Sequence, residues 1–127
     1  MVTLLAGIVP HFFPMTDKIV ILSTCSTDLE AEKLARLLVE ERLAACVNIV
    51  PRMRSYYRWQ GAVESAEECL LVIKSARSLF GPLREALERA HSYEVPEVLA
   101  LPILGGSAAY LNWMDSNLET GRETAGE

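Results

Sequence analysis

The chain contains two unusually long stretches in which the order of apolar and polar residues is typical of β-strands. They run from Ala44 to Trp59 and from Ala62 to Ser75, are rich in β-branched, aromatic and alternating apolar residues, and meet at Gln60-Gly61. Pro51 is their one interruption. Because strands in globular proteins usually have about 5–6 residues, the pattern predicts a hairpin that projects past the core of a 127-residue chain.

A projecting hairpin would leave aromatic side chains and strand edges without cover. We therefore expect an oligomer in which hairpins pair between chains, with any active or binding site where they meet. Tyr, Trp and Arg are enriched in protein interfaces, so the expected interface is Tyr56, Tyr57, Arg58, Trp59 and Gln60. A ligand pocket at these residues is the alternative.

The remaining periodicities alternate between strand and helix. Thr27 and Glu30 fit a capping box, and Pro102 implies that the last strand lies at an edge or near its end. The expected elements are a strand at 18–24, a helix from 27 to about 43, a helix from 80 to about 91, a strand at 98–104, and a helix capped by Ser107. The order βαββαβ plus a C-terminal helix predicts an α+β, ferredoxin-like fold with a long central hairpin.

Composition indicates one soluble globular domain, expected at residues 17–119. Residues 1–16 are expected to be an extension outside the core, because Met15-Thr16-Asp17-Lys18 is typical of a chain start and is followed at once by a strand. Their apolar part is broken by Gly7 and Pro10 and is too short to span a bilayer. Residues 120–127 are polar and are expected to be a flexible tail. No membrane partner is expected.

Net charge and cysteine content limit which kinds of partner and which cellular compartment we expect for this protein. The net charge of −5, with 17 acidic against 12 basic residues, argues against a nucleic-acid partner. Cys25, Cys46 and Cys69 form neither a CxxC motif nor a disulfide framework, so a cytoplasmic location is expected. A metallochaperone would have paired cysteines where Cys25 stands alone, and the apolar run 69–73 disfavours an RNA-recognition module.

The segment 91–97 has the highest density of groups that can donate, accept or ligate. It holds His91, Tyr93, Glu94 and Glu97, and Pro96 forces the preceding residue into an extended conformation. Helix termination explains the segment as well as a functional site does, because a histidine is favourable at a helix C-terminus.

Two further positions have both a structural and a functional interpretation. Cys46 is either an inert thiol in an apolar strand or a soft metal ligand. Thiolate and imidazole together suit copper or zinc, but a site containing them would have to be assembled by folding or between chains. Lys74 is either a rim residue or an anion contact.

Several collinear blocks resemble the CutA divalent-cation-tolerance family. They are Glu41–Pro51, Arg54-Ser55, Tyr57–Gly61, Leu71–Ser75, His91, Tyr93–Glu97 and Leu101–Ile103. The resemblance implies a homotrimer of ferredoxin-like subunits, similar to nitrogen-regulatory PII trimers, that is linked to divalent-metal tolerance and to copper binding. It implies no catalytic reaction, so we expect no enzyme and no organic cofactor.

Family positions map onto residues of this chain. The resemblance marks Cys46, the hairpin aromatics Tyr57 and Trp59, Lys74, and the loop residues His91, Tyr93, Glu94 and Glu97. The leading hypothesis is a cytoplasmic trimer that binds copper or another divalent cation through Cys46 and His91, with Glu94 or Glu97. The chain departs from the family in having Ser26 and Ser92 where proline is usual.

Two other functions stay open. One is a signalling module whose inter-subunit cleft, lined by Tyr57, Trp59, Lys74 and Tyr93, receives an anionic metabolite. The other is an enzyme that uses the loop carrying His91 and Tyr93 for acid–base chemistry, although the chain has no recognisable pairing of nucleophile and base.

Overall fold

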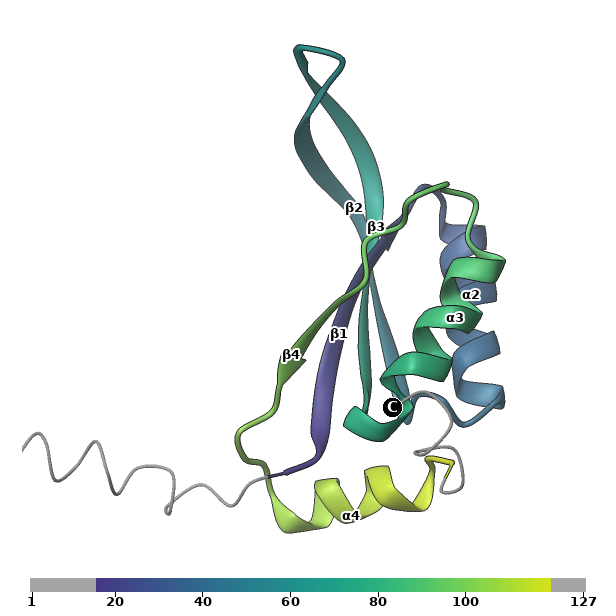
Figure 1. Cartoon of the computed structure of the whole chain (residues 1–127), viewed down its shortest axis with the longest axis vertical. Coiled ribbons are helices and arrows are strands. Elements are labelled where there is room, and N and C mark those ends of the chain that lie inside the picture. The colour runs from purple at the N-terminus through teal and green to yellow at the C-terminus, as the bar shows by residue number, and fades with distance from the viewer. Residues whose placement is uncertain (1–15, 120–127) are drawn as a thin grey trace, which may run out of the picture.

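The computed structural model describes residues 16–119 as an α+β domain with a four-stranded antiparallel sheet in the order β2-β3-β1-β4, which is the ferredoxin-like arrangement (Figure 1). The elements are β1 (Lys18–Cys25), α2 (Asp28–Glu40), β2 (Cys46–Trp59), β3 (Ala62–Ala76), the 3-10 turn η1 (Arg77–Leu79), α3 (Phe80–Ala90), β4 (Leu99–Pro102) and α4 (Ala108–Ser116). Within residues 16–119, no helix has the length and apolar character needed to cross a membrane. Except for residue 16, the predicted extension and tail lie outside the described part.

The long hairpin predicted from the sequence is confirmed. β2 and β3 pair from Cys46 opposite Lys74 to Trp59 opposite Ala62. Gln60 and Gly61 both have positive φ, 50° and 84°, as a two-residue type I′ turn requires. β1 pairs with β3 only as far as Cys69, so the outer half of the hairpin projects beyond the sheet, and no third strand from residues 16–119 lies beside it (Figure 1).

An irregularity in β2 marks the point where the hairpin leaves the sheet. The β2–β3 register shifts between Val50 and Met53, and Arg52 has a φ of 56°. Pro51 has no N–H to donate to a ladder, which fits a break in the pairing. Such a bulge increases the local twist and bends the strand, so it sets the direction in which the hairpin projects.

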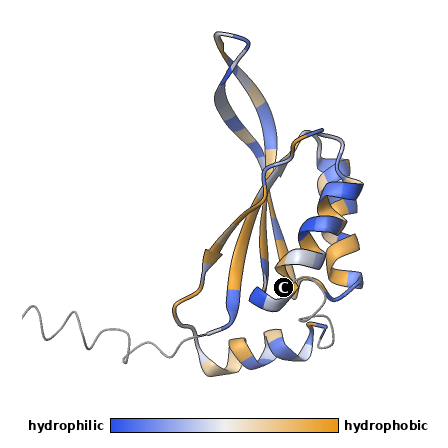
Figure 2. Ribbon diagram, in the orientation of Figure 1, coloured by the Kyte–Doolittle hydropathy of each residue, from blue (hydrophilic) through white to orange (hydrophobic). Residues whose placement is uncertain are grey.

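The hydrophobic core lies between the sheet and the two helices α2 and α3, which cover one face (Figure 1). Figure 2 shows apolar residues concentrated in the strands near the helices and mixed with polar residues along the hairpin. Alternate residues of β1 and β3 point into this core, as a half-covered sheet requires. The largest apolar side chains buried there are Ile21, Leu34, Leu38, Leu43, Leu71, Ile73, Leu79, Leu83, Leu87 and Met114.

The first helix is shorter than its apolar periodicity predicts. α2 ends at Glu40, and Arg42 adopts a left-handed conformation with a φ of 60°. The Leu43 N–H then bonds the Leu38 carbonyl at 2.9 Å and the Arg42 N–H bonds the Val39 carbonyl at 3.0 Å, which together form a Schellman motif. The sequence hides this stop because an arginine occupies the position that glycine usually takes. The last strand is likewise shorter than expected, but it lies at an edge and ends at Pro102, as predicted.

Two buried serines allow a matched test of core polarity. Ser75 Oγ donates to the Leu43 carbonyl at 2.6 Å, whereas Ser23 Oγ, also fully buried, has no partner among residues 16–119. Ser75→Ala is expected to lower the free energy of unfolding by about 1–2 kcal/mol, and Ser23→Ala to leave it unchanged or slightly higher. Urea unfolding of both variants measures this. Equal losses would show that Ser23 does have a partner.

Candidate functional site

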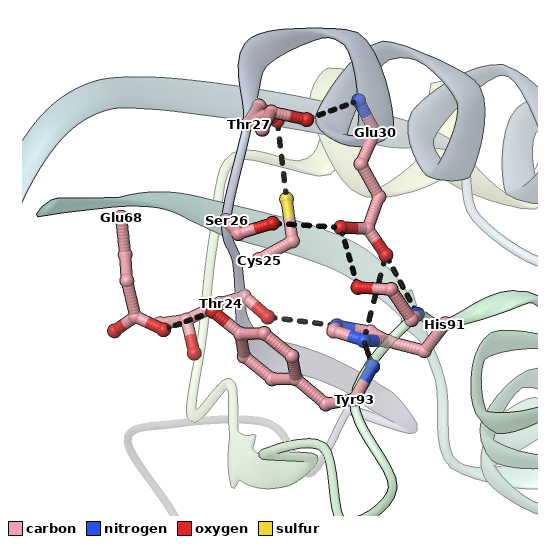
Figure 3. A network of polar contacts seen from close by, with 9 residues as sticks. Thr24, Cys25, Ser26, Thr27, Glu30, Glu68, His91 and Tyr93 are labelled. Carbon is pink, nitrogen blue, oxygen red and sulfur yellow. Dashed lines mark hydrogen bonds and ion pairs between the residues drawn. The ribbon is translucent and has the colours of Figure 1, made fainter. Parts of the chain in front are cut away.

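His91 organises the loop that follows α3. It ends the helix, and its side chain is fully buried, with 0% exposed. Nε2 lies 2.8 Å from the Thr24 carbonyl, and the Tyr93 N–H donates to Nδ1 at 3.0 Å (Figure 3). Because a carbonyl can only accept, Nε2 carries the proton and Nδ1 is the acceptor. Both ring nitrogens therefore have protein partners.

Glu30 holds the same loop from the first turn of α2. Its carboxylate accepts hydrogen bonds from the Ser92 N–H at 2.8 Å and the Ser92 hydroxyl at 2.9 Å, and it lies 3.6 Å from His91 Nδ1 (Figure 3). Burial opposes ionisation, but the two hydrogen bonds from Ser92 outweigh it, so the pKa of Glu30 lies below its usual value.

The predicted capping box is confirmed only in part. The Thr27 hydroxyl accepts from the Glu30 N–H at 3.1 Å, as expected. The Glu30 carboxylate instead bonds Ser92, at the position where the resemblance described above leads us to expect proline. A proline could donate neither hydrogen bond, so this serine gives the loop an anchor of its own.

The Glu30 anchor gives the fold a defined sensitivity to acid. Because its folded-state pKa lies below the reference value of 4.5, the carboxylate adds stability above that pH which is lost as the pH falls through the folded-state pKa. Glu30→Gln is expected to lower the free energy of unfolding by about 1–2 kcal/mol at pH 7 and by much less near pH 3. Urea unfolding from pH 3 to 7, with the exposed Glu32→Gln on the same helix as control, measures this. A difference independent of pH would contradict it.

Tyr93 joins the loop to the base of the hairpin. Its hydroxyl donates to Glu68 Oε2 at 2.7 Å (Figure 3). The Ser55 hydroxyl donates to Glu68 Oε1 at 2.6 Å. Burial and the bond to Glu68 raise the pKa of the Tyr93 hydroxyl well above its usual value, so it remains a donor. Residues far apart in the sequence thus form one connected network.

This network forms the floor of a cleft of about 900 Å³ between the loop and the hairpin. Aromatic side chains and carboxylates dominate its walls. The lining residues are Thr24, Ser55, Tyr56, Tyr57, Trp59, Glu64, Ala66, Glu68, Tyr93, Glu94, Val95 and Glu97. Four are glutamates and none is a lysine or arginine, so among the described residues the lining attracts cations and repels anions.

The structure gathers five of the predicted site residues in this cleft and separates three others from it. Tyr57, Trp59, Tyr93, Glu94 and Glu97 all line the cleft, whereas His91 lies behind it, buried in the network. Lys74 and Cys46 lie on the sheet, outside both the cleft and the network. The Lys74 ammonium is 5.9 Å from the centre of the Tyr110 ring. Cys46 is half-buried and lies opposite Lys74.

Cys46 and His91 lie apart within one chain. Cys46 is opposite Lys74, which in turn is opposite Val20 of β1, while His91 binds Thr24. Four residues along a strand span about 13 Å, and Cys46 is two strands further across the sheet. Within residues 16–119, no three histidine, cysteine, aspartate or glutamate side chains come together in a way that could hold a metal ion. A centre made of Cys46, His91, Glu94 and Glu97 would need side chains from a second chain and a rearranged His91.

Sequence reasoning missed the anchoring carboxylates. Glu30 has its local role as a capping residue, and Glu68 stands in an ordinary strand pattern. Glu68 directly precedes the apolar run 69–73 of β3, but only the structure shows that its charge lies on a half-buried position.

The fold and the cleft define a small ferredoxin-like domain with a projecting hairpin and an acidic, aromatic cleft at the hairpin's base. The family model described as "CutA1 divalent ion tolerance protein" matches residues 19–117. The chain belongs to this family.

Individual relatives agree with this assignment. The "Divalent-cation tolerance protein CutA" of Thermus thermophilus is 48% identical over 98 residues, which cover 77% of this chain and 95% of that protein. "Protein CutA, chloroplastic" of Arabidopsis thaliana is 50% identical over 99 residues, 78% of this chain, but the chain spans only 54% of that relative. The crystal structure of CutA1 from Oryza sativa superposes with a TM-score of 0.82 at 41% identity and covers 84% of this chain and 98% of that one.

Proposed function

We propose that the protein is a cytoplasmic homotrimer that binds divalent cations, copper above all, at the cleft between the 91–97 loop and the hairpin. The observation that carries the proposal is the cleft's composition, which combines four glutamates with aromatic walls. The family description and the name of the Thermus thermophilus relative both refer to tolerance of divalent ions rather than to a reaction, which favours a binding protein over an enzyme.

The argument for a trimer begins with the uncovered hairpin. Tyr56 and Trp59 are 67% and 59% exposed, and no strand within residues 16–119 pairs with either edge of the outer hairpin. An isolated two-stranded hairpin is marginally stable, and a second chain that pairs with it supplies both hydrogen bonds and apolar cover. The exposed Leu99 and Leu101 on the edge strand β4 offer another such surface. The trimeric state itself follows from the family resemblance.

The argument for a cation begins with the cleft's oxygen donors. Carboxylates are ligands for divalent metals, and for a given set of nitrogen and oxygen donors Cu²⁺ binds most tightly among the first-row divalent ions. Glu94 and Glu97 are the proposed ligands in the cleft, and His91 fixes the loop that carries them. In this arrangement Cys46 contributes only if another subunit brings it to the site. The three free cysteines support a reducing compartment.

The anion-binding alternative loses its main support. It requires Lys74 in the cleft, but Lys74 lies elsewhere against Tyr110, and the cleft's charged groups are carboxylates. The buried His91 uses both ring nitrogens in bonds to the backbone, so in the part of the chain that the structure describes it is not free to act as a base in the cleft.

Neutralising the two loop carboxylates tests the proposal. Glu94→Gln with Glu97→Gln is expected to weaken Cu²⁺ binding at least tenfold, because each variant keeps the shape and removes a negative ligand. Calorimetric titration of the reduced protein with Cu²⁺ measures this. Glu67→Gln with Glu85→Gln removes the same charge from exposed positions outside the cleft and is the matched control.

The outcomes of this titration separate the hypotheses. Weakened binding in the first pair alone supports a site at the cleft. Equal weakening of Cu²⁺ binding in the two double variants would show that only the net charge of the protein matters. Unchanged binding in both double variants would exclude Glu94 and Glu97 as ligands.

A further inference from the structure

Cys25 and Cys69 face each other across two neighbouring strands. They are directly opposite in the antiparallel register of β1 and β3, so their side chains lie on the same face of the sheet. Directly opposed residues in such a ladder have Cα atoms about 4.5–5.5 Å apart, which falls within the range that a disulfide spans. Both are free thiols and both are buried, Cys25 completely and Cys69 with 3% exposed.

Each thiol donates a hydrogen bond to a residue at the start of α2. The Cys69 thiol donates to Asp28 Oδ1 at 3.0 Å, and the Cys25 thiol donates to the Thr27 carbonyl at 3.6 Å. Burial, Glu30 and Cys69 raise the pKa of Cys25 to about 12, and the bond to Asp28 together with burial raises the pKa of Cys69 to about 11. Both cysteines are therefore protonated at neutral pH.

The third cysteine is excluded from this pair by its position. Cys46 is opposite Lys74 in the β2–β3 ladder, at the other end of the shared sheet from the Cys25–Cys69 pair. The fold thus selects one of the three pairings that three cysteines allow.

We propose that Cys25 and Cys69 form a redox-sensitive dithiol that a hydroperoxide converts to an intrachain disulfide. In the first step the Cys69 thiolate attacks the peroxide, the O–O bond breaks, and a sulfenic acid and an alcohol or water form. In the second step the Cys25 thiolate attacks the sulfenic sulfur, and the S–S bond forms as water leaves. The two thiols lose two protons and two electrons in total, and the hydroperoxide is reduced.

The disulfide would alter the start of α2. Oxidation removes both thiol donors, so Asp28 and the Thr27 carbonyl each lose one hydrogen bond. Glu30, which anchors the loop at the cleft, lies on the same first turn. The modification therefore lies directly behind the candidate cation site, although its formation does not depend on cation binding.

Peptide mapping tests the pairing directly. Each cysteine lies in a different tryptic peptide: 19–33 holds Cys25, 43–52 holds Cys46 and 59–74 holds Cys69. The full chain is treated with hydrogen peroxide, blocked with N-ethylmaleimide in denaturant, and digested without reduction. The expected product is a single cross-linked species of peptides 19–33 and 59–74, two hydrogens lighter than their sum, with Cys46 in no intrachain cross-link. The rate should rise with pH, because only the minor thiolate form reacts.

Two controls test whether the pairing depends on the folded structure and on the named cysteines. The same treatment in concentrated urea should scramble the pairings, and Cys46→Ser should retain the cross-link in the folded chain while Cys69→Ser loses it. Two results would overturn the proposal. One is a mixture of different cross-linked pairs from the folded wild type. The other is that peptides 19–33 and 59–74 both carry N-ethylmaleimide, and so still had free thiols, while Cys46 has been oxidised. The wild-type map decides the matter even if a variant fails to fold.

Discussion

The Tyr56→Ala, Trp59→Ala double variant is expected to run as a monomer, close to the 14.1 kDa of one wild-type chain, whereas the wild type is expected to have three times that mass. Both aromatics lie on the projecting half of the hairpin, and truncating two large side chains at an interface commonly costs about 2 kcal/mol or more each. Light scattering coupled to gel filtration measures the mass directly. The variant should have the lower mass at every protein concentration at which the wild type is found assembled.

A third aromatic outside the hairpin provides the control for this variant. Trp113 on α4 is also exposed, so Trp113→Ala removes an exposed aromatic side chain of the same kind as Trp59. It is expected to leave the mass unchanged. A double variant that keeps the wild-type mass would exclude these aromatics as the main contact, and a monomeric wild type would contradict the trimer altogether.

His91→Ala is expected to have the largest effect on the stability of any loop substitution. The variant loses the hydrogen bonds to Thr24 and Tyr93 and leaves a void in a fully buried position, which together cost about 2–4 kcal/mol. Because the loop carries Glu94 and Glu97, Cu²⁺ affinity should fall as well. Urea unfolding at a fixed protein concentration measures the first effect, since the stability of an oligomer, which we propose this protein to be, depends on concentration.

Ser92→Ala is the matched control for His91→Ala. It removes one exposed hydroxyl from the Glu30 anchor and keeps the Ser92 N–H bond, so a loss of at most about 1 kcal/mol is expected. If His91→Ala cost no more than Ser92→Ala, the buried network around His91 would not be the element that holds the loop.

Elements with a local cause could be predicted from the sequence. The hairpin follows from the strand pattern on both sides of Gln60-Gly61, and the cap at Thr27 from a hydroxyl placed just before an apolar helical face. The Schellman stop at Arg42 and the bulge at Arg52 could not, because an arginine stands where a left-handed conformation normally selects glycine.

The sequence allowed several residues of the candidate site to be predicted, but not the hydrogen bonds that connect them. The loop residues Tyr93, Glu94 and Glu97 are recognisable by their density of functional groups, and they do line the cleft. The bonds from Glu30 to Ser92 and from Glu68 to Tyr93 join residues 62 and 25 positions apart, which no local pattern can specify. For the same reason the distance between Cys46 and His91 became apparent only once the strand register was known.

Native mass spectrometry of the reduced wild type with graded Cu²⁺ tests the central claim most directly, because one spectrum reports both assembly and bound metal. We expect a trimer of 14.1 kDa subunits that takes up as many as three ions, one for each equivalent cleft, and loses them when Glu94 and Glu97 become glutamine. A monomer, or a trimer that takes up copper equally with and without these carboxylates, would contradict the account.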